Sequence, residues 1–282
     1  MKNLKKFIVI PVFNDWKSLN KLLKQLDINL KKKFNKIEIL IINDNSTEKI
    51  RFTSLKFNCL KKINVLTLSK NVGSQRAIAL GLLYLKKTKE DFIVTVMDAD
   101  GEDDPTQVSK MITLAAENSK YVITSNRKNR KETKLIIFLY HLHLLLTFLF
   151  TFKWISFGNF TCFHKRNLLR LFNDSSSFCA HSSAVMKNCR IKRVYAKRKK
   201  RYFDKSKLGL TSLIEHSLRV NAVFFKNTIC SSIIYIFLFV TFFPKILSLL
   251  LMVLVLIFNF FIIFVKFKYP KKLISYKKQK FL

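Results

Sequence analysis

The sequence predicts an α/β fold: a mostly parallel sheet with flanking helices, followed by interfacial amphipathic helices and a C-terminal two-helix transmembrane hairpin. Three observations lead to this prediction. Short β-branched and aromatic runs alternate with helical patterns through residues 1–125. One of these runs ends in five acids within the seven residues 98–104. Two long apolar stretches near the C-terminus are separated only by Pro244 and Lys245.

The alternating part of the chain predicts strands that are buried on both faces, because their apolar runs are continuous. The predicted strands are Phe7–Phe13, Ile37–Ile42, Ile63–Leu68, Phe92–Met97 and Tyr121–Thr124. Helices are expected near 15–29, 47–58, 74–87 and 105–118. Alternation at this spacing favours a parallel sheet with right-handed crossovers. Ligands of such sheets bind beyond the carboxyl ends of the strands.

Composition favours a membrane surface over nucleic acid as the partner. The 282 residues suffice for one large domain or a domain with an appendage. The net charge is +35, yet 49% of the residues are hydrophobic, and twelve of the 17 acids precede residue 111. The second half is therefore both basic and apolar, as anionic lipids prefer. General over-use of Lys and Phe is the plainer explanation for part of this excess.

The cysteine spacing predicts reduced thiols, and the N-terminal residues predict a first strand. The five cysteines are scattered, without metal-ligand spacing, which is typical of reduced thiols. Residues 1–13 are read as a basic start and a first strand rather than a signal peptide, because Pro11 ends the apolar run after about seven residues.

The hydrophobic segments differ in how well they fit a spanning helix. Residues 135–157 are long enough to span, but His141 and Lys153 interrupt them and the following segment is strongly basic. An in-plane or re-entrant helix fits better, with a spanning helix left open. Residues 228–243 and 246–265 predict a transmembrane hairpin whose basic flanks face the cytoplasm, with a buried soluble hairpin as the alternative. The Lys-rich tail 266–280 is expected to be a solvated, lipid-facing arm.

The acidic cluster predicts a site for a divalent cation. Adjacent carboxylates repel one another, and Mg²⁺ or Mn²⁺ would cancel that repulsion while sharing its coordination with substrate phosphates. Asp98 and Asp100 follow the strand directly, which makes this pair a candidate metal–diphosphate site. The alternative is an acidic turn that caps a helix starting at Pro105, a role that Asp103 and Asp104 could fill.

Four motifs, taken in order, resemble the family 2 glycosyltransferases of GT-A, Rossmann-like fold. They are Ile10–Asp15, Ile42–Ser46, Asn71–Ala77 and Asp98–Pro105. The chain is most similar to the branch of dolichol- and polyprenyl-phosphate sugar transferases, and Gly158–Phe160, Arg201–Lys207 and the terminal hairpin also fall where that branch has counterparts. The resemblance implies a nucleotide-sugar-binding core at 1–132, an acceptor half with interfacial helices at 133–226, a transmembrane hairpin at 227–266 and a basic cytoplasmic tail at 267–282.

The resemblance also implies roles for individual residues. The residues expected to bind the nucleotide-sugar donor are Pro11, Asn14, Asp15, Asp44, Ser46, Asn71, Gly73, Arg76, Asp98, Ala99 and Asp100. The metal ligands would be Asp98, Asp100 and Glu102, and Asp98 and Asp100 would also be catalytic. The resemblance assigns no general base; if one is required, Asp103 or Asp104 is the candidate, and Asp103 is taken as the third catalytic residue. The acceptor phosphate would meet Arg127, Arg130, Asn159, Arg201, Lys205 and Ser206. His181 and His216 recur at matching places in some relatives.

Plainer interpretations stay open for several of these residues. Asp44 and Ser46 could form an N-cap or Asx-turn, Arg76 could be a surface arginine, and the basic residues could be a solvated patch. Asn159 stands where many relatives carry an acid, which a lipid phosphate acceptor does not need, because it is already an anion.

The sequence therefore predicts a membrane-anchored, inverting, metal-dependent transferase, with its catalytic domain on the cytoplasmic side of the inner membrane. It would move a sugar from a nucleotide-diphosphate sugar to a polyprenyl phosphate or related lipid. The first alternative is non-processive transfer to a sugar hydroxyl of a glycolipid or polysaccharide, since the Gln-x-x-Arg-Trp motif of processive synthases does not occur. A non-catalytic basic membrane scaffold is the second. Homo-oligomerisation is left open.

Overall fold

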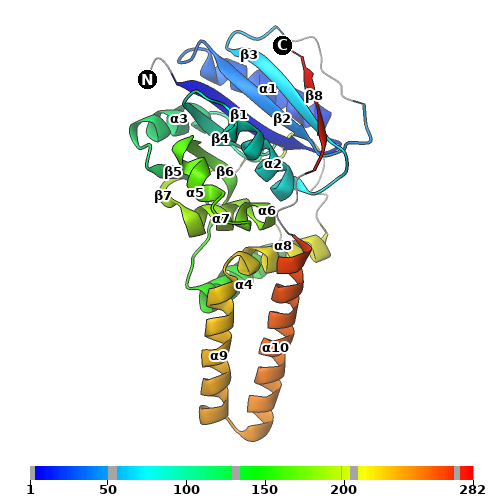
Figure 1. The fold of residues 1–282 in the computed structure, drawn as a ribbon, viewed down its shortest axis with the longest axis vertical. Helices are drawn as coiled ribbons and strands as arrows, with labels where there is room; N and C mark the ends of the chain where they lie inside the picture. The colour runs from blue at the N-terminus through cyan, green and yellow to red at the C-terminus, as the bar shows by residue number, and fades with distance from the viewer. Residues whose placement is uncertain are drawn as a thin grey trace.

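A computed structural model of the chain describes residues 4–49, 56–128, 134–197, 199–203, 209–269 and 274–281. An α/β part carries a helical stalk at one end (Figure 1). The predicted mixed α/β architecture is confirmed.

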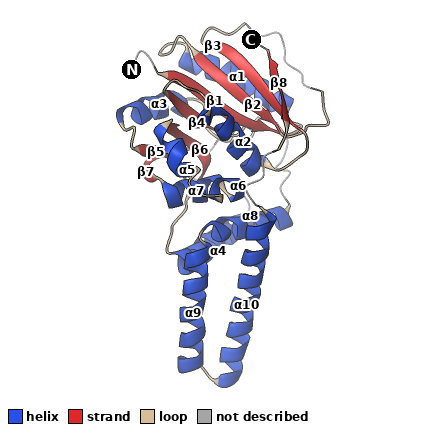
Figure 2. Ribbon diagram, viewed as in Figure 1, coloured by secondary structure: helices blue, strands red, loops and turns tan. Residues whose placement is uncertain are grey.

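One eight-stranded sheet organises the α/β part, in the order β7-β5-β6-β4-β1-β2-β3-β8 (Figure 2). The strands are β1 (Lys5–Val12), β2 (Ile37–Asn43), β3 (Leu60–Leu68), β4 (Phe92–Val96), β5 (Tyr121–Lys128), β6 (Phe157–His164), β7 (Arg190–Lys197) and β8 (Tyr276–Lys280). The five predicted strands are confirmed, and β4, β1, β2 and β3 pair in parallel. The strands β6, β7 and β8 are not among those that the sequence predicts. Of these, β6 runs antiparallel between β4 and β5.

Helices cover both faces of the sheet. On one face lie α1 (Trp16–Leu30) and α3 (Gln107–Glu117), and α3 packs on β4, β5 and β6. On the other face lie α2 (Ser74–Lys86) and the short helices α5 (Arg166–Leu171), α6 (Ser176–Cys179) and α7 (His181–Asn188). Large side chains such as Leu22 and Phe178 are fully buried in these two layers. The three helices predicted near 15–29, 74–87 and 105–118 are therefore confirmed.

The predicted helix at 47–58 is wrong for the residues that the structure describes. Residues 47–49 and 56–58 are not helical, and 50–55 lie outside the described ranges. The reason is a competing partner: the Thr47 and Glu48 N–H groups donate to Oδ1 of Asn14, at 2.9 and 3.2 Å. The loop after β2 is thereby tied to the loop after β1 instead of turning on itself.

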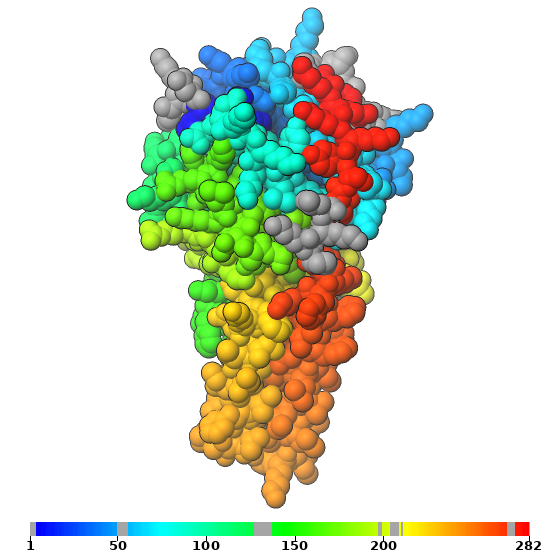
Figure 3. Space-filling view, in the orientation of Figure 1, coloured from blue at the N-terminus to red at the C-terminus, as the bar shows by residue number. Residues whose placement is uncertain are grey.

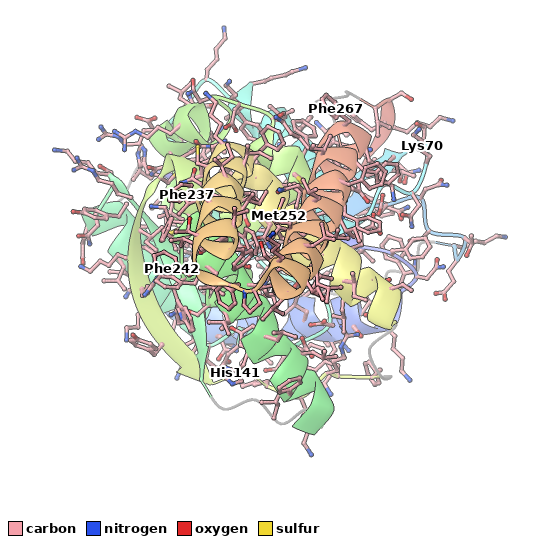
Figure 4. All side chains as sticks on the ribbon, turned by 90° about the horizontal axis from the view of Figure 1, so that it is seen from below. Lys70, His141, Phe237, Phe242, Met252 and Phe267 are labelled. Atoms are coloured by element: carbon pink, nitrogen blue, oxygen red, sulfur yellow. The ribbon has the colours of Figure 1, made fainter. Side chains whose placement is uncertain are left out.

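Two helices lie across the end of the α/β part from which the stalk begins (Figure 1). They are α4 (Lys134–Thr151) and α8 (Leu210–Val223). Asn221 Nδ2 of α8 donates to Thr147 Oγ1 of α4 at 3.3 Å. The view from below shows α4, with His141, extending out from beneath the stalk (Figure 4). This placement agrees with a helix that does not span, although its depth in a bilayer stays a prediction.

The stalk is an antiparallel pair, α9 (Phe225–Phe242) and α10 (Lys245–Lys268). Their side chains are largely exposed, with Phe242 at 72% and Ile246 at 80% (Figure 3). Among the described residues, these are the two helices long and apolar enough to cross a membrane, a judgement of length and composition alone. Ser232 Oγ donates to Asn259 Oδ1 between them at 3.1 Å.

The C-terminal tail joins the sheet. β8 pairs antiparallel with β3, from Leu68↔Tyr276 to Asn64↔Lys280. The prediction of a lipid-facing arm is therefore wrong for Tyr276–Lys280, although this strand is solvent-exposed as expected. The physical reason is the open edge of β3, whose backbone groups offer a template for pairing. The Tyr276 ring also packs edge-on against Tyr84, with ring centres 6.0 Å apart.

Candidate active site

The sheet brings the predicted polar residues to one edge. Val12 pairs with Asn43 and Val9 with Val96, so β1, β2 and β4 end side by side. The loops that follow these strands carry Asn14, Asp44 and Asp98. The meeting of these loops at the carboxyl edge, inferred from strand order, is confirmed.

Asp44 holds the loop that precedes α2. Its carboxylate accepts hydrogen bonds from the N–H groups of Val72 and Gly73, each at 2.8 Å. Burial raises the pKa of Asp44 to about 6, even though these two bonds and Arg76 favour the charged form. Asp44 is thus neither an N-cap nor an Asx-turn of its own segment. Gly73 adopts φ +82°, a conformation that glycine tolerates best.

The other donor-binding candidates lie beside this loop. Ser46 Oγ accepts the N–H of Asn14 at 3.0 Å, and Asn71 Oδ1 accepts the N–H of Gly73 at 3.1 Å. Pro11 lies in β1 opposite Ile42. Asp15 caps α1 by accepting the N–H of Ser18 at 3.4 Å.

The acidic cluster forms a compact loop after β4. Asp103 Oδ2 accepts the N–H of Asp98 at 3.1 Å, and Asp100 Oδ1 accepts the N–H of Glu102 at 3.0 Å. Asp104 Oδ1 accepts the N–H of Thr106 at 3.0 Å, just before α3. Asp103 thus holds the loop, and Asp104 holds the turn before α3. Neither side chain caps that helix, whose N-cap residue is Thr106, so the capping alternative is not what the structure shows. Asp98 and Asp100 take no part in capping.

The segment 199–203 covers the acidic loop. The N–H of Tyr202 donates to the Asp100 carbonyl at 2.9 Å, and the N–H of Lys199 to the Glu102 carbonyl at 3.0 Å. Arg201 Nη2 lies 2.7 Å from Asp100 Oδ2, and its Nε lies 3.5 Å from Glu102 Oε1. Arg201 thus pairs with two predicted metal ligands in this structure, and its role at the acceptor phosphate stays a prediction.

The electrostatics of the loop reflect crowded carboxylates. Burial and the nearby charge of Asp98 raise the pKa of Asp100 to about 6, while Arg201 opposes the shift. Over the described part of the chain, no group of three or more His, Cys, Asp or Glu side chains is gathered as a metal site. The predicted trio Asp98, Asp100 and Glu102 is thus not assembled around one point in this conformation.

The side-chain amides of Asn159 and Gln75 connect Asp98 to the backbone of His181 by hydrogen bonds, and we call these groups the amide relay. Asn159 Nδ2 donates to Asp98 Oδ1 at 3.1 Å, and Gln75 Nε2 donates to Asn159 Oδ1 at 3.0 Å. Gln75 Oε1 accepts the N–H of buried His181 at 2.7 Å. This amide relay fixes the direction of every amide in it, because the His181 N–H can only donate. Asn159 therefore faces Asp98 rather than a basic cluster.

His181 is a packing residue. Its Nε2 shares a hydrogen bond with Thr161 Oγ1 at 2.9 Å, and burial lowers its pKa to about 4. Gln75 lies within the predicted motif Asn71–Ala77, but the motif gave it no role, because its partners are far away in the sequence. Ala99 is buried in the core layer that α1 and α3 cover.

Several residues predicted to bind the acceptor phosphate have side chains that the structure does not describe. Arg130, Lys205 and Ser206 lie outside the described residues, and of Arg127 only the backbone, in β5, is described. These assignments stay predictions.

An α/β sheet with an Asp-x-Asp loop at its carboxyl edge is the arrangement that the motifs predicted for a glycosyltransferase. The sequence profile of Glycosyl transferase family 2 matches residues 7–189, more than half of the chain. The chain belongs to this family, as the motifs predicted.

Curated relatives come from the predicted branch. An undecaprenyl-phosphate 4-deoxy-4-formamido-L-arabinose transferase of Pseudomonas savastanoi pv. phaseolicola is 29% identical over 129 residues, 45% of this chain and 36% of that protein. A dodecaprenyl-phosphate galacturonate synthase of Rhizobium johnstonii is 22% identical over 134 residues, 47% of this chain and 38% of that protein. The matches span little more than a third of each relative's length.

Solved structures share the fold. Glucosyl-3-phosphoglycerate synthase from Mycobacterium tuberculosis, in complex with Mn²⁺, UDP and phosphoglyceric acid, superimposes with a TM-score of 0.54 at 13% identity, over 80% of this chain and 79% of that one. Mannosyl-3-phosphoglycerate synthase from Rubrobacter xylanophilus gives 0.52 at 14% identity, over 79% and 73%. These likenesses establish the GT-A fold alone.

Proposed function

We propose that this family 2 glycosyltransferase is a membrane-anchored, inverting enzyme that moves a sugar from a nucleotide-diphosphate sugar to a polyprenyl phosphate or a related lipid acceptor. The observation that carries the proposal is the position of the Asp98–Asp100 loop at the carboxyl edge of the sheet, in a family whose curated members include polyprenyl-phosphate transferases. The stalk supports the membrane part of the proposal by its length and apolar surface.

The donor set at the edge fits Mg²⁺ or Mn²⁺. Two carboxylates suffice, because Mg²⁺ usually binds through one or two carboxylates and completes its shell with water and substrate phosphates. Burial and the charge of Asp98 raise the pKa of Asp100, and a cation beside it would offset both effects, as Arg201 does in part here. Asp98 and Asp100 would hold the cation, with Glu102 adjacent. A bound cation would neutralise charge that develops on the departing diphosphate.

The chain's own residues prepare this edge for transfer. Asn159 and Gln75 orient Asp98, and Asp103 fixes the backbone beneath it. The loop at Gly73, which Asp44 holds, offers a close backbone approach for the nucleotide. An acceptor phosphate is an anion near neutral pH, so its oxygen can attack the anomeric carbon without a general base. Attack opposite the leaving diphosphate inverts the configuration at that carbon.

The arrangement of the helices suggests how a lipid acceptor reaches the site. α4 and α8 lie between the stalk and the sheet (Figure 1), where an interfacial helix would hold the site at headgroup level. Lys266 and Lys268 end α10 on this side, and Arg219 lies in α8. Retention of these charges on the cytoplasmic side would place the catalytic part in the cytoplasm, at the inner membrane.

The decisive experiment is a donor screen on the full chain in lipid nanodiscs. Labelled UDP- and GDP-sugars are offered with polyprenyl phosphate, with Mn²⁺ or Mg²⁺ present, and the lipid product is detected by mass. Asp100→Ala should abolish product, because one of the two carboxylates for the cation is lost. Full activity of Asp100→Ala, or failure of every donor to form a lipid product, would contradict the proposal.

Two other functions predict different results. When an oligosaccharide lipid is offered in a parallel reaction, non-processive transfer to a sugar hydroxyl would label that lipid and leave polyprenyl phosphate unlabelled. A non-catalytic scaffold would show no metal-dependent binding of nucleotide sugars in calorimetry. The amide relay argues against the scaffold, because it holds a half-exposed carboxylate in place with buried polar groups that packing alone would not select.

A further inference from the structure

Arg219 is held rigidly in α8, and neither the sequence motifs nor the proposed chemistry gives it a role. Its Nε donates to the carbonyl of Cys179 in α6 at 2.8 Å. The centre of its guanidinium lies 4.1 Å from the centre of the Tyr269 ring, just beyond α10. The Tyr269 hydroxyl in turn donates to Glu215 of α8. A fixed, planar guanidinium of this kind is prepared to bind an oxyanion.

Two arginine nitrogens in this region are buried without a partner. Within the described ranges, Arg219 Nη2 and Arg76 Nε have no hydrogen-bond acceptor and no exposed surface. Leaving a buried charged donor unpaired is costly, and such groups in folded proteins call for an explanation. Two of them on separate elements, α8 and α2, point to an acceptor that comes from a ligand.

Helices α2 and α8, which carry the two arginines, both pack against α6. Burial lowers the pKa of Arg76, and the positive charge of Arg219 lowers it further. Both arginines border α6: Arg219 bonds to its last residue, and Gln75, beside Arg76, bonds to His181 just after it. Like charges are brought together here by the fold, which favours an anion between them.

The neighbouring acids are already engaged. Asp44 faces Arg76 electrostatically, but both of its oxygens accept backbone N–H groups. Glu215 faces Arg219, but it accepts from Lys268 at 2.8 Å and from Tyr269. Neither carboxylate makes a hydrogen bond to either arginine that satisfies the two orphaned nitrogens.

We propose that Arg219 joins Arg76, which the motifs already predict to bind the donor, in an anion subsite for a phosphate group between the loop that Asp44 holds and the helix α8. A phosphate has several oxygens in different directions, so it can accept from both guanidinium groups at once. The subsite is distinct from the acidic loop, where Arg201 is paired. Its assignment to a substrate phosphate rests on the proposed function, and two sources share this chemistry: the diphosphate of the donor and the phosphate of a lipid acceptor.

Direct binding on the full chain in nanodiscs tests the subsite without turnover. The probes are UDP with Mn²⁺ and farnesyl phosphate, and the variants are Arg76→Gln and Arg219→Gln. Lys226→Gln is the matched control, since it removes one exposed positive charge from the start of α9 and leaves the pair intact. Each arginine variant should weaken one probe at least tenfold beyond the control.

The outcome identifies the source or overturns the proposal. Weaker UDP binding alone assigns the donor diphosphate, weaker farnesyl phosphate binding alone assigns a lipid phosphate, and weakening of both assigns a subsite that both groups contact. Affinities for both probes within twofold of Lys226→Gln in both variants overturn it. Arg76→Gln keeps the test valid if loss of the Arg219 contacts to Cys179 and Tyr269 unfolds the protein. A protein that binds both probes but forms no product would contradict the proposed function and leave the subsite standing.

Discussion

Gln75 offers a sharp test of the amide relay, because two of its variants separate stability from site geometry. Gln75→Leu removes the acceptor of the buried His181 N–H and the donor to Asn159. An unsatisfied buried N–H costs about 1–3 kcal/mol and a lost hydrogen bond about 1 kcal/mol. The variant should therefore lose about 2–4 kcal/mol of unfolding free energy.

Gln75→Glu keeps the acceptor for His181 but cannot donate to Asn159. The Asn159 amide then turns its NH₂ group toward Glu at 75 and its oxygen toward Asp98, where an amide donor now lies at 3.1 Å. An oxygen facing that carboxylate repels it and disturbs the cation site. We expect Gln75→Glu to unfold closer to the parent than Gln75→Leu, yet to bind Mn²⁺ and UDP about tenfold more weakly, or about 1.4 kcal/mol.

Denaturant unfolding and calorimetry of the full chain measure both quantities. Gln279→Leu is the control, because Gln279 lies on the exposed strand β8 and far from the relay in sequence. Parent-like binding by Gln75→Glu would refute the idea that the relay orients Asp98. Parent-like stability of Gln75→Leu would refute the cost assigned to the His181 N–H.

Three further predictions test separate parts of the molecule. Gly101→Ala should destabilise the protein by more than about 1 kcal/mol. Gly101 has a φ of +86°, and a Cβ at this position would lie 2.6 Å from the Tyr202 ring. An unchanged thermal unfolding temperature would contradict this prediction. Burial lowers the pKa of His181 from 6.5 to about 4. Between these two pH values the imidazole is protonated in the unfolded chain and neutral in the folded chain. His181 therefore contributes stability that is complete above pH 6.5 and falls by about 2 kcal/mol at pH 5, whereas Asp44 and Asp100, whose pKa values are raised to about 6, act in the opposite direction. The measurement is therefore the difference in unfolding free energy between the parent and His181→Gln, which should change by about 2 kcal/mol from pH 7 to pH 5. A difference that does not depend on pH would contradict the lowered pKa of His181. Asn259→Leu should loosen the stalk by about 0.6–1.7 kcal/mol through loss of its bond to Ser232, measured by unfolding in detergent; greater stability would argue against that bond.

The sequence by itself determined the parts of this protein whose physics is local. Continuous apolar runs predict buried parallel strands, and β1, β2 and β4 appear where those runs lie. The acids at 98 and 100 follow such a run, so their place at the carboxyl edge follows from strand direction alone. Two uninterrupted apolar stretches likewise predict the stalk, since nothing but length and composition is needed.

The tertiary structure decided which strands pair with one another and which side chains form hydrogen bonds. β6 carries Gly158 and Asn159, which weaken a strand signal, and it exists because β4 and β5 leave room for an antiparallel strand between them. β8 is polar and exposed, and only the open edge of β3 makes it a strand. Gln75 meets Asn159 across 84 residues and His181 across 106. Contacts at such separations depend on the order of strands and the packing of helices, and no local pattern in the chain encodes them.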